Sequence, residues 1–539
     1  MPIFRTISLY LFTIIFLGMS VIGCSTKLPE DVKPTSPKPF TYEKYEVSTG
    51  TDKNQTVFTG FLSDSTLAEL AVVNIEKNST RRLRIYAYKN GTWELTLNTS
   101  LRPQIRFVDI TTIKGRDRLI TYEHGRLNWF DLDSRSEQKL LNITTNYNMI
   151  DLDKVSHIDI TRDLNGDGLD DLVLPDFDGF WISTQLNNGS FTDPVKLGPP
   201  EPFLDKTALD QNRSYREVGI NELTALWYLS RLHQMDCNGD KRTDLVFWNE
   251  DHFDAYLQNT HGAFSADVKT FTTDVTFDSD GAYAIAFDFS GENMFALMVG
   301  FREKTKRRIL HTFQDMNTDG ITDMIIHTLE GRSIGNQRST YDVHFGIQAA
   351  EGIVFAEDVG MTIKPRGTAG GLLPWGYASY WLQDFDNDGD LDFLFRDVNT
   401  KITGMARAMV GKSIAVNLEL FRMENRSFPE KPTTKRKIRP ALDLFETERV
   451  FFPPVLSGDV NGDRLLDLIV GKNWSEMHIF LGEQTPKVFA KKPQKVIVTM
   501  PNDERNIWLV DLNRDNKKDI LIKNRSVTQQ NQVTMLISK

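Results

Sequence analysis

Short apolar runs recur along the chain, and each follows a cluster of Asp, Asn and Gly residues. The runs occupy residues 172–174, 245–248, 324–326, 393–395, 468–470 and 520–522. Their hydrophobicity is continuous rather than alternating, which is typical of strands covered on both faces. We therefore expect each run to be an inner strand of a layered β structure.

Further strands are predicted on both sides of each cluster. Strand-like segments precede the clusters, as at 157–160, 380–382 and 507–510, and hairpin signals follow the runs, as at Asn188-Gly189 and Asn90-Gly91. The pattern predicts four antiparallel strands per repeat. A single four-stranded sheet cannot bury both of its faces by itself. Such units are typical of the blades of a β-propeller, so we predict an all-β fold.

Two less regular repeats precede the six clusters. Asp109 and Asp117 keep the first and last positions of the pattern, but Thr111 and Ile113 stand at its third and fifth positions, and 61–72 has the strand–turn–strand order without ligands. We therefore predict eight blades, with seven as the alternative. The last repeat has room for only one more strand, so we expect 40–48 to pair with 532–538 and close the ring, which removes open sheet edges.

The clusters themselves share the pattern Asp-x-Asn/Asp-x-Asp-x-x-x-Asp. Oxygen side chains at positions 1, 3, 5 and 9, with a backbone carbonyl near position 7, can converge on one hard cation such as calcium. The predicted calcium ligands, loop by loop, are Asp163, Asn165, Asp167 and Asp171; Asp236, Asn238, Asp240 and Asp244; Asp315, Asn317, Asp319 and Asp323; Asp384, Asp386, Asp388 and Asp392; Asp459, Asn461, Asp463 and Asp467; Asp511, Asn513, Asp515 and Asp519.

The sixth position of each loop must make a sharp turn, which Gly168 permits. Lys241, Arg464 and Asn516 replace glycine there in three loops. Asn adopts a left-handed backbone easily, whereas Lys or Arg does so at a cost of about 1 kcal/mol. We expect the loops with Lys241 and Arg464 to bind calcium more weakly or to use another backbone geometry.

Composition supports one folded body that contains metal. Of the 539 residues, 40% are hydrophobic and 25% are charged, as in a globular protein, and a repeat fold can hold this length in one closed domain. The net charge of −10 is concentrated in the proposed ligands, so about six bound cations would bring it near neutrality. Nothing in the sequence is typical of a nucleic-acid-binding surface, and we expect no nucleic-acid partner.

The N-terminus is typical of an export signal, with Arg5 before a mostly apolar stretch. It ends in Val21-Ile22-Gly23-Cys24, which resembles a bacterial lipobox, whose Cys becomes the lipidated first residue of the mature protein. We therefore predict a signal peptide at 1–23, a Pro-rich tether at 24–40 and a propeller at 41–539. A plain transmembrane anchor is the alternative, although the apolar stretch is short for one. Ser25 after the Cys resembles an outer-membrane address, which implies a lipid-anchored envelope protein.

The repeated Asp-x-Asn-x-Asp-Gly-x-x-Asp pattern followed by an apolar strand resembles the FG-GAP or VCBS repeat family. The best-known relatives in that family are the propellers of integrin α-chains, and bacterial members are common among exported proteins. The resemblance covers about residues 55–530 and implies that the loop residues bind calcium. It does not specify a function.

Repetition argues that the loops are structural. Catalysis needs one distinct site with an open coordination position, whereas stabilising ions can repeat. The loops join first and second strands, so variable function is expected at the opposite end, where long connections lie. The best candidate there is 366–377, in which Arg366, Trp375 and Tyr377 could stack on a sugar or a peptide aromatic; the alternative is a segment that caps the channel.

No nucleophile motif, zinc-protease motif or phosphate-binding loop is present in the sequence. The leading hypothesis is a calcium-stabilised, monomeric lipoprotein of the cell envelope that binds a protein or a glycan as an adhesion or scaffold module. The alternatives are an enzyme that acts on envelope polysaccharide, in the manner of a lyase, and an assembly factor for surface structures.

Overall fold

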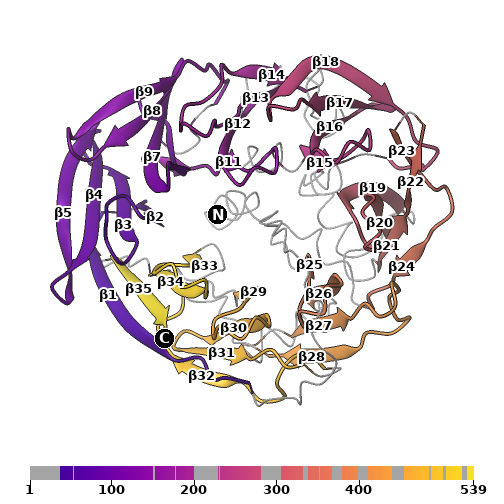
Figure 1. The fold of residues 1–539 in the computed structure, drawn as a ribbon. Coiled ribbons are helices and arrows are strands. Elements are labelled where there is room, and N and C mark those ends of the chain that lie inside the picture. Colours follow the sequence, from indigo (N-terminus) through magenta and orange to yellow (C-terminus); the bar gives the residue numbers. More distant parts are fainter. Residues whose placement is uncertain are drawn as a thin grey trace, which may run out of the picture.

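The computed structural model describes residues 37–539 except 53, 148, 150–151, 177, 199–228, 230, 279, 281–304, 332–337, 351, 367–378, 399–410, 412, 414, 440–453, 485–486, 502–505 and 525–530. The described residues form a ring of eight blades, each built on four antiparallel strands (Figure 1). The predicted eight-bladed β-propeller is confirmed, and the alternative of seven blades is wrong. Within the described ranges, no helix is long and apolar enough to cross a bilayer.

In blades 1 to 7 the four main strands follow one another in chain order from the centre of the ring outwards. Blades 1 to 4 contain β2 (Thr56–Gly60), β3 (Glu69–Ile75), β4 (Arg81–Lys89) and β5 (Thr92–Leu101); β6 (Phe107–Ile113), β7 (Arg116–Glu123), β8 (Arg126–Asp131) and β9 (Ser136–Leu141); β11 (Thr161–Arg162), β12 (Asp171–Asp176), β13 (Gly179–Ser183) and β14 (Val195–Leu197); β15 (His233–Met235), β16 (Asp244–Asn249), β17 (His252–Gln258) and β18 (Phe264–Phe271). Blades 5 to 7 contain β19 (Thr305–Gln314), β20 (Asp323–Gly331), β21 (Arg338–His344) and β24 (Met361–Ile363); β25 (Ser379–Gln383), β26 (Asp392–Val398), β27 (Val416–Phe421) and β28 (Thr434–Ile438); β29 (Val455–Gly458), β30 (Asp467–Asn473), β31 (Glu476–Phe480) and β32 (Gln494–Ile497).

Blade 8 joins the two ends of the described chain. Its inner strands are β33 (Ile507–Val510), β34 (Asp519–Asn524) and β35 (Asn531–Ser538), and its outer strand is β1 (Tyr42–Gly50). β1 runs antiparallel to β35, from Tyr42 opposite Ser538 to Gly50 opposite Asn531 (Figure 1). The predicted closure of the ring by N- and C-terminal strands is therefore confirmed.

All six Asp/Asn-rich loops connect the first strand of a blade to the second. The ninth Asp of each loop is also the first residue of the second strand, as Asp171 is in β12 and Asp467 is in β30. The hairpins between third and fourth strands lie at the same end of the antiparallel blades. We call this side of the ring the loop face; it carries residues 163–171, 236–244, 315–323, 384–392, 459–467 and 511–519.

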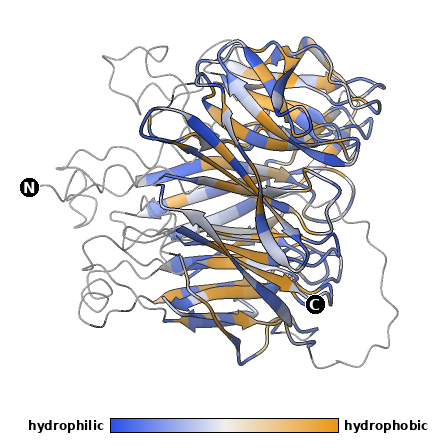
Figure 2. Cartoon of the chain, turned by 90° about the vertical axis from the view of Figure 1, so that its left-hand side faces the viewer, coloured by the Kyte–Doolittle hydropathy of each residue, from blue (hydrophilic) through white to orange (hydrophobic). Residues whose placement is uncertain are grey.

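The core is a series of hydrophobic clusters between neighbouring blades. Phe58 and Leu83 of blade 1 pack with Leu119 of blade 2, and the series continues around the ring to Leu70 of blade 1, which packs with Met535 of blade 8. Figure 2 shows hydrophobic residues along the stacked strands. This packing explains the continuous apolar runs, because a second strand is covered on both faces by adjacent blades.

Two local predictions are corrected. Residues 157–160 were expected to form the inner strand of blade 3, but β10 (Ser156–His157) pairs in parallel with β6 of blade 2, and the inner strand is β11. The segment between Asp109 and Asp117, where an incomplete form of the loop pattern was expected, is a tight hairpin: Thr112 pairs with Asp117, and Lys114 and Gly115 turn the chain with positive φ. Blade 5 also carries an extra hairpin, β22 (Gly346–Ala349) and β23 (Gly352–Phe355), which was not predicted.

Candidate metal centre

The first Asp of each loop organises the backbone by accepting N–H groups on its carboxylate. In the first loop, Asp163 Oδ1 accepts the N–H groups of Gly166 at 2.7 Å and Asp167 at 3.1 Å, and Oδ2 accepts that of Gly168 at 3.0 Å. The N–H of the sixth residue reaches the first Asp in every loop, between 2.7 and 3.0 Å. The six loops therefore share one backbone arrangement.

Two positions in each loop have a left-handed backbone, and only one of them was predicted. At the sixth position, φ is 68° for Lys241 and 69° for Arg464, in the same region as the 80° of Gly168. The expectation of another backbone geometry in those two loops is wrong, while weaker cation binding there stays a prediction. The fourth position is left-handed as well, and its residues are Gly166, Gly239, Thr318, Asn387, Gly462 and Arg514. Glycine at three of these was the signal in the sequence.

The third and fifth positions face each other across the turn. In four loops the Asn at position 3 donates its side-chain amide to the Asp at position 5; the distance is 3.1 Å from Asn165 to Asp167 and 2.9 Å from Asn461 to Asp463. The other oxygen of each position-5 Asp accepts the N–H of position 7. The loop interior thus presents carboxylate and amide oxygens, the ligand type that calcium prefers.

The ninth Asp is bound into the fold by both of its oxygens. Asp467 accepts the N–H of Val460 at 2.9 Å and that of Gly482, beyond the third strand, at 2.8 Å, and the other five loops repeat this arrangement. Burial raises the pKa of Asp467 to about 7 and that of Asp392 to about 8. Each oxygen keeps another lone pair, so a metal-ligand role for this residue stays a prediction.

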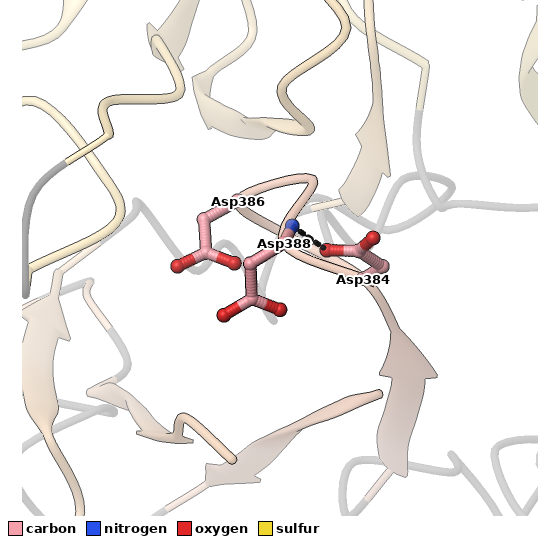
Figure 3. Close-up of side chains that lie close together, drawn as sticks. All are labelled: Asp384, Asp386 and Asp388. Atoms are coloured by element: carbon pink, nitrogen blue, oxygen red, sulfur yellow. Dashed lines mark hydrogen bonds between the residues drawn. The ribbon is translucent and has the colours of Figure 1, made fainter. Parts of the chain in front are cut away.

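The fourth loop differs because position 3 is a carboxylate. Asp384, Asp386 and Asp388 each place an oxygen within 4.8 Å of the others (Figure 3). Asp386 is 5% exposed, and its Oδ1 has no hydrogen-bond partner among the described residues. Burial and the charge of Asp388 raise the pKa of Asp386 to about 6. Three crowded acids with an unpartnered buried oxygen fit a cation better than any other loop does.

An arginine from outside the fourth loop compensates part of the negative charge of these three acids. Arg422, directly after β27, lies with Nε 2.5 Å from Asp386 Oδ2 and with Nη2 3.0 Å from Asp388 Oδ2. The motif spacing gave no signal for this residue. Basic side chains also contact the position-5 Asp in two other loops, namely Arg242 at Asp240 and Lys517 at Asp515.

Neighbouring loops are connected across the blade boundaries. Leu466 of the fifth loop donates its N–H to Phe385 O of the fourth at 3.2 Å, and Lys518 of the sixth donates to Asp459 O of the fifth at 2.8 Å. The side chain of Gln258 in blade 4 donates to Asn165 O of the first loop at 2.7 Å. Hydrogen bonds therefore link each of these loops to the adjacent blade.

The other predicted site residues lie elsewhere. Arg366 is exposed in the connection after β24, a fourth strand, and therefore on the side opposite the loop face; its N–H donates to Glu419 Oε2 at 2.6 Å. Trp375, Tyr377 and Cys24 lie outside the described residues. The ligand and lipidation assignments stay predictions.

The class of protein is defined by the strand order: the chain is a β-propeller. No family description and no curated protein matches it. Similar solved structures include the Dos1 propeller (9% identity, 93% of this chain and 95% of that chain, TM-score 0.38) and Sqt1 from Chaetomium thermophilum (9%, 93% and 100%, 0.37). The V. cholerae biofilm matrix protein Bap1 is also similar (11%, 91% and 68%, 0.24).

Proposed function

We propose that this β-propeller is a calcium-stabilised binding module of the bacterial cell envelope, of the FG-GAP or VCBS type. The main support for bound calcium is the fourth loop, where three carboxylates lie close together and one oxygen of Asp386 has no hydrogen-bond partner among the described residues. The shared backbone arrangement of all six loops supports the same role in the others. A bound cation in each loop offsets the repulsion between its carboxylates and so stabilises the first turn of the blade.

The second part of the proposal is a lipid anchor at Cys24. Its support is the sequence Val21-Ile22-Gly23-Cys24 and the Pro-rich segment that follows. In this proposal the ring is attached to the outer membrane, and the side opposite the loop face, with Arg366, Trp375 and Tyr377, receives a protein or glycan ligand. The protein is proposed to retain the ligand without turnover, because the loops repeat while catalysis needs a distinct open site.

Calcium is tested by melting the protein with calcium and after chelation, together with a titration that counts bound ions. Calcium should raise the melting temperature by several degrees, since ligand that binds only the folded state stabilises it. Asp384→Asn/Asp388→Asn should lower the number of bound ions by one. The matched control, Asp131→Asn/Asp133→Asn in a turn of blade 2 without the motif, should leave that number unchanged. An identical melting curve with and without calcium would exclude structural calcium.

The anchor and the ligand need separate tests. Labelling with a radioactive fatty acid should mark the wild-type protein and not Cys24→Ala; an unlabelled wild-type protein would exclude the lipid anchor. Purified protein incubated with envelope polysaccharide should retain the glycan unchanged in length. Shortened glycan chains would instead support the polysaccharide-degrading enzyme.

A further inference from the structure

The chain enters the ring on the loop face, at blades 7 and 8. Lys38 O accepts the side-chain amide of Asn461, the third residue of the fifth loop, at 2.7 Å. Two residues later, Phe40 is buried, its N–H donates to Gln494 Oε1 at 3.0 Å, and Gln494 donates back to Phe40 O at 2.6 Å. The segment before β1 is therefore fixed against blade 7 before it becomes the outer strand of blade 8.

The distance from this entry point to the proposed anchor is short. Lys38 is the fourteenth residue after Cys24, and an extended chain of that length spans at most about 50 Å. The described chain joins the body at the loop face of blades 7 and 8. The inference that follows rests on the proposed lipid anchor and on the proposed cations in the fifth and sixth loops.

This part of the loop face is rich in basic side chains. They come from the entry segment, from the two loops, from the connection between β31 and β32, and from the chain after β35: Lys38, Arg464, Lys487, Lys491, Lys492, Arg514, Lys517, Lys518 and Lys539. All are exposed except Lys517 and Lys518, which are half-buried. We call these nine residues the basic surface.

The loop face of blades 3 and 5 is different. The first and third loops, 163–171 and 315–323, contain no Lys or Arg, and neither do the connections after the third strands of their blades, 184–194 and 345–360. The carboxylates within the basic surface include Asp459, Asp463, Asp511 and Asp515 of the two loops, which the proposed cations would neutralise. Outside the loops, Glu43 pairs with Lys539, and Glu483 lies in the connection between β31 and β32. Basic residues are thus more numerous at blades 7 and 8, where the tether joins the ring, than at blades 3 and 5.

We propose that the basic surface docks the propeller on the membrane by binding the phosphates of anionic lipid headgroups. Lys and Arg side chains at a membrane surface are attracted by the negative potential of such lipids, and the attraction falls within a Debye length. A lipid surface is the occupant we favour because the proposed anchor brings the basic surface to it. Docking in this orientation directs the loop face to the lipid and the opposite face, with Arg366, away from it.

The test uses the chain from residue 24 onwards with Cys24→Ser, so that binding is independent of lipidation. Every blade is completed by residues after Lys38, so this chain retains the whole described fold. It is sedimented with vesicles of phosphatidylcholine containing phosphatidylglycerol, and with vesicles of phosphatidylcholine alone, at one calcium concentration. We expect binding to the anionic vesicles only, with a bound fraction that falls as salt rises.

Charge reversal locates the surface. Lys491→Glu/Lys492→Glu should weaken vesicle binding by about tenfold or more. The matched control is Lys139→Glu/Lys269→Glu, which makes the same charge change at exposed positions on the outer strands β9 and β18 and should leave binding as it is. Equal loss in both variants, or equal binding to neutral vesicles, would overturn the docking surface.

The outcomes separate this inference from the proposed function. If fatty-acid labelling of the wild-type protein fails while the Cys24→Ser chain binds anionic vesicles through Lys491 and Lys492, the anchor is wrong and the docking surface stands. If labelling succeeds and the Cys24→Ser chain ignores anionic vesicles, the anchor stands and the docking surface is wrong. Retention on a soluble polyanion without vesicle binding would also overturn it.

Discussion

The carboxylate of Glu69 accepts the backbone N–H of Leu62 at 2.9 Å, in a blade that lacks the metal-loop residues. Glu69 is the first residue of the second strand of blade 1, is 1% exposed, and also hydrogen-bonds to Ser63. It holds the turn as the ninth Asp does in the six loops. A buried acid at the start of a second strand therefore has a structural role that requires no metal ion.

Glu69→Ala should lower the free energy of unfolding by about 1 to 3 kcal/mol, because it leaves the buried N–H of Leu62 without a partner. The loss should be the same with calcium and after chelation, since no cation is proposed in blade 1. Urea unfolding of both samples measures it. Glu46→Ala, at an exposed position of β1, is the control and should stay within about 0.5 kcal/mol of the wild type.

Arg422→Met should make the protein more dependent on calcium. Without the guanidinium, Asp386 and Asp388 keep their mutual repulsion, so the calcium-free protein should lose about 1 to 3 kcal/mol, whereas a cation in the loop should restore most of it. Melting curves at several calcium concentrations measure the difference. Lys431→Met, an exposed change in the same connection, should respond to calcium as the wild type does; an Arg422→Met variant with that same response would contradict the prediction.

The left-handed sixth position predicts opposite effects for two substitutions. Lys241→Gly should stabilise the second loop by up to about 1 kcal/mol, because glycine adopts the 68° φ without strain. Gly168→Ala should destabilise the first loop by about 1 kcal/mol through the backbone alone, since an added Cβ meets no atom within 4 Å. Denaturation midpoints of the two variants, compared with the wild type, should move in opposite directions.

Buried His233 predicts a loss of stability in mild acid. The side chain is 5% exposed and packs edge-on against Phe313 at 5.2 Å, and burial lowers its pKa to about 4. The unfolded state then binds a proton from about pH 6.5 downwards while the folded state stays neutral, so this residue makes stability fall as the pH decreases from 6.5 to 4. In His233→Phe the fall over that window should be smaller than in the wild type.

The control for this prediction is His261→Phe, at an exposed hairpin position, which should keep the wild-type pH profile. Unfolding by urea at closely spaced pH values measures both variants. An unchanged profile in His233→Phe would show that the imidazole titrates equally in the folded and unfolded states.

The sequence patterns predicted the ring because each pattern reflects a local structural requirement, namely the burial of a second strand or the geometry of a turn. The apolar runs correspond to second strands covered by both neighbouring blades, and the missing outer strand of the last repeat predicted the pairing of β1 with β35. The Asp residues at both ends of each loop were visible because the turn itself needs them to accept N–H groups. Which of these oxygens bind a cation stays a prediction.

What the sequence did not predict depends on contacts between distant residues. Ser156–His157 pairs with β6 because Asp109, in blade 2, accepts the N–H of Ile160 at 2.7 Å and lies 2.9 Å from the His157 ring nitrogen. Arg422 reaches the fourth loop from the end of the third strand of the same blade, which is distant from the loop in sequence. Neither interaction leaves a periodic signal in the chain.

The pairing of β1 with β35 has a consequence for biosynthesis. The outer strand of blade 8 is made before the other seven blades and its partner after them, so the two edges cannot meet until β35 has been synthesised. Until then β1 can pair with the β35 of another copy, which would give a domain-swapped chain of molecules rather than a closed monomer. Because Lys539 donates its N–H to Thr41 O at 2.8 Å, a short peptide linking the two ends, with new termini cut in another blade, would move this vulnerable seam without changing a single blade.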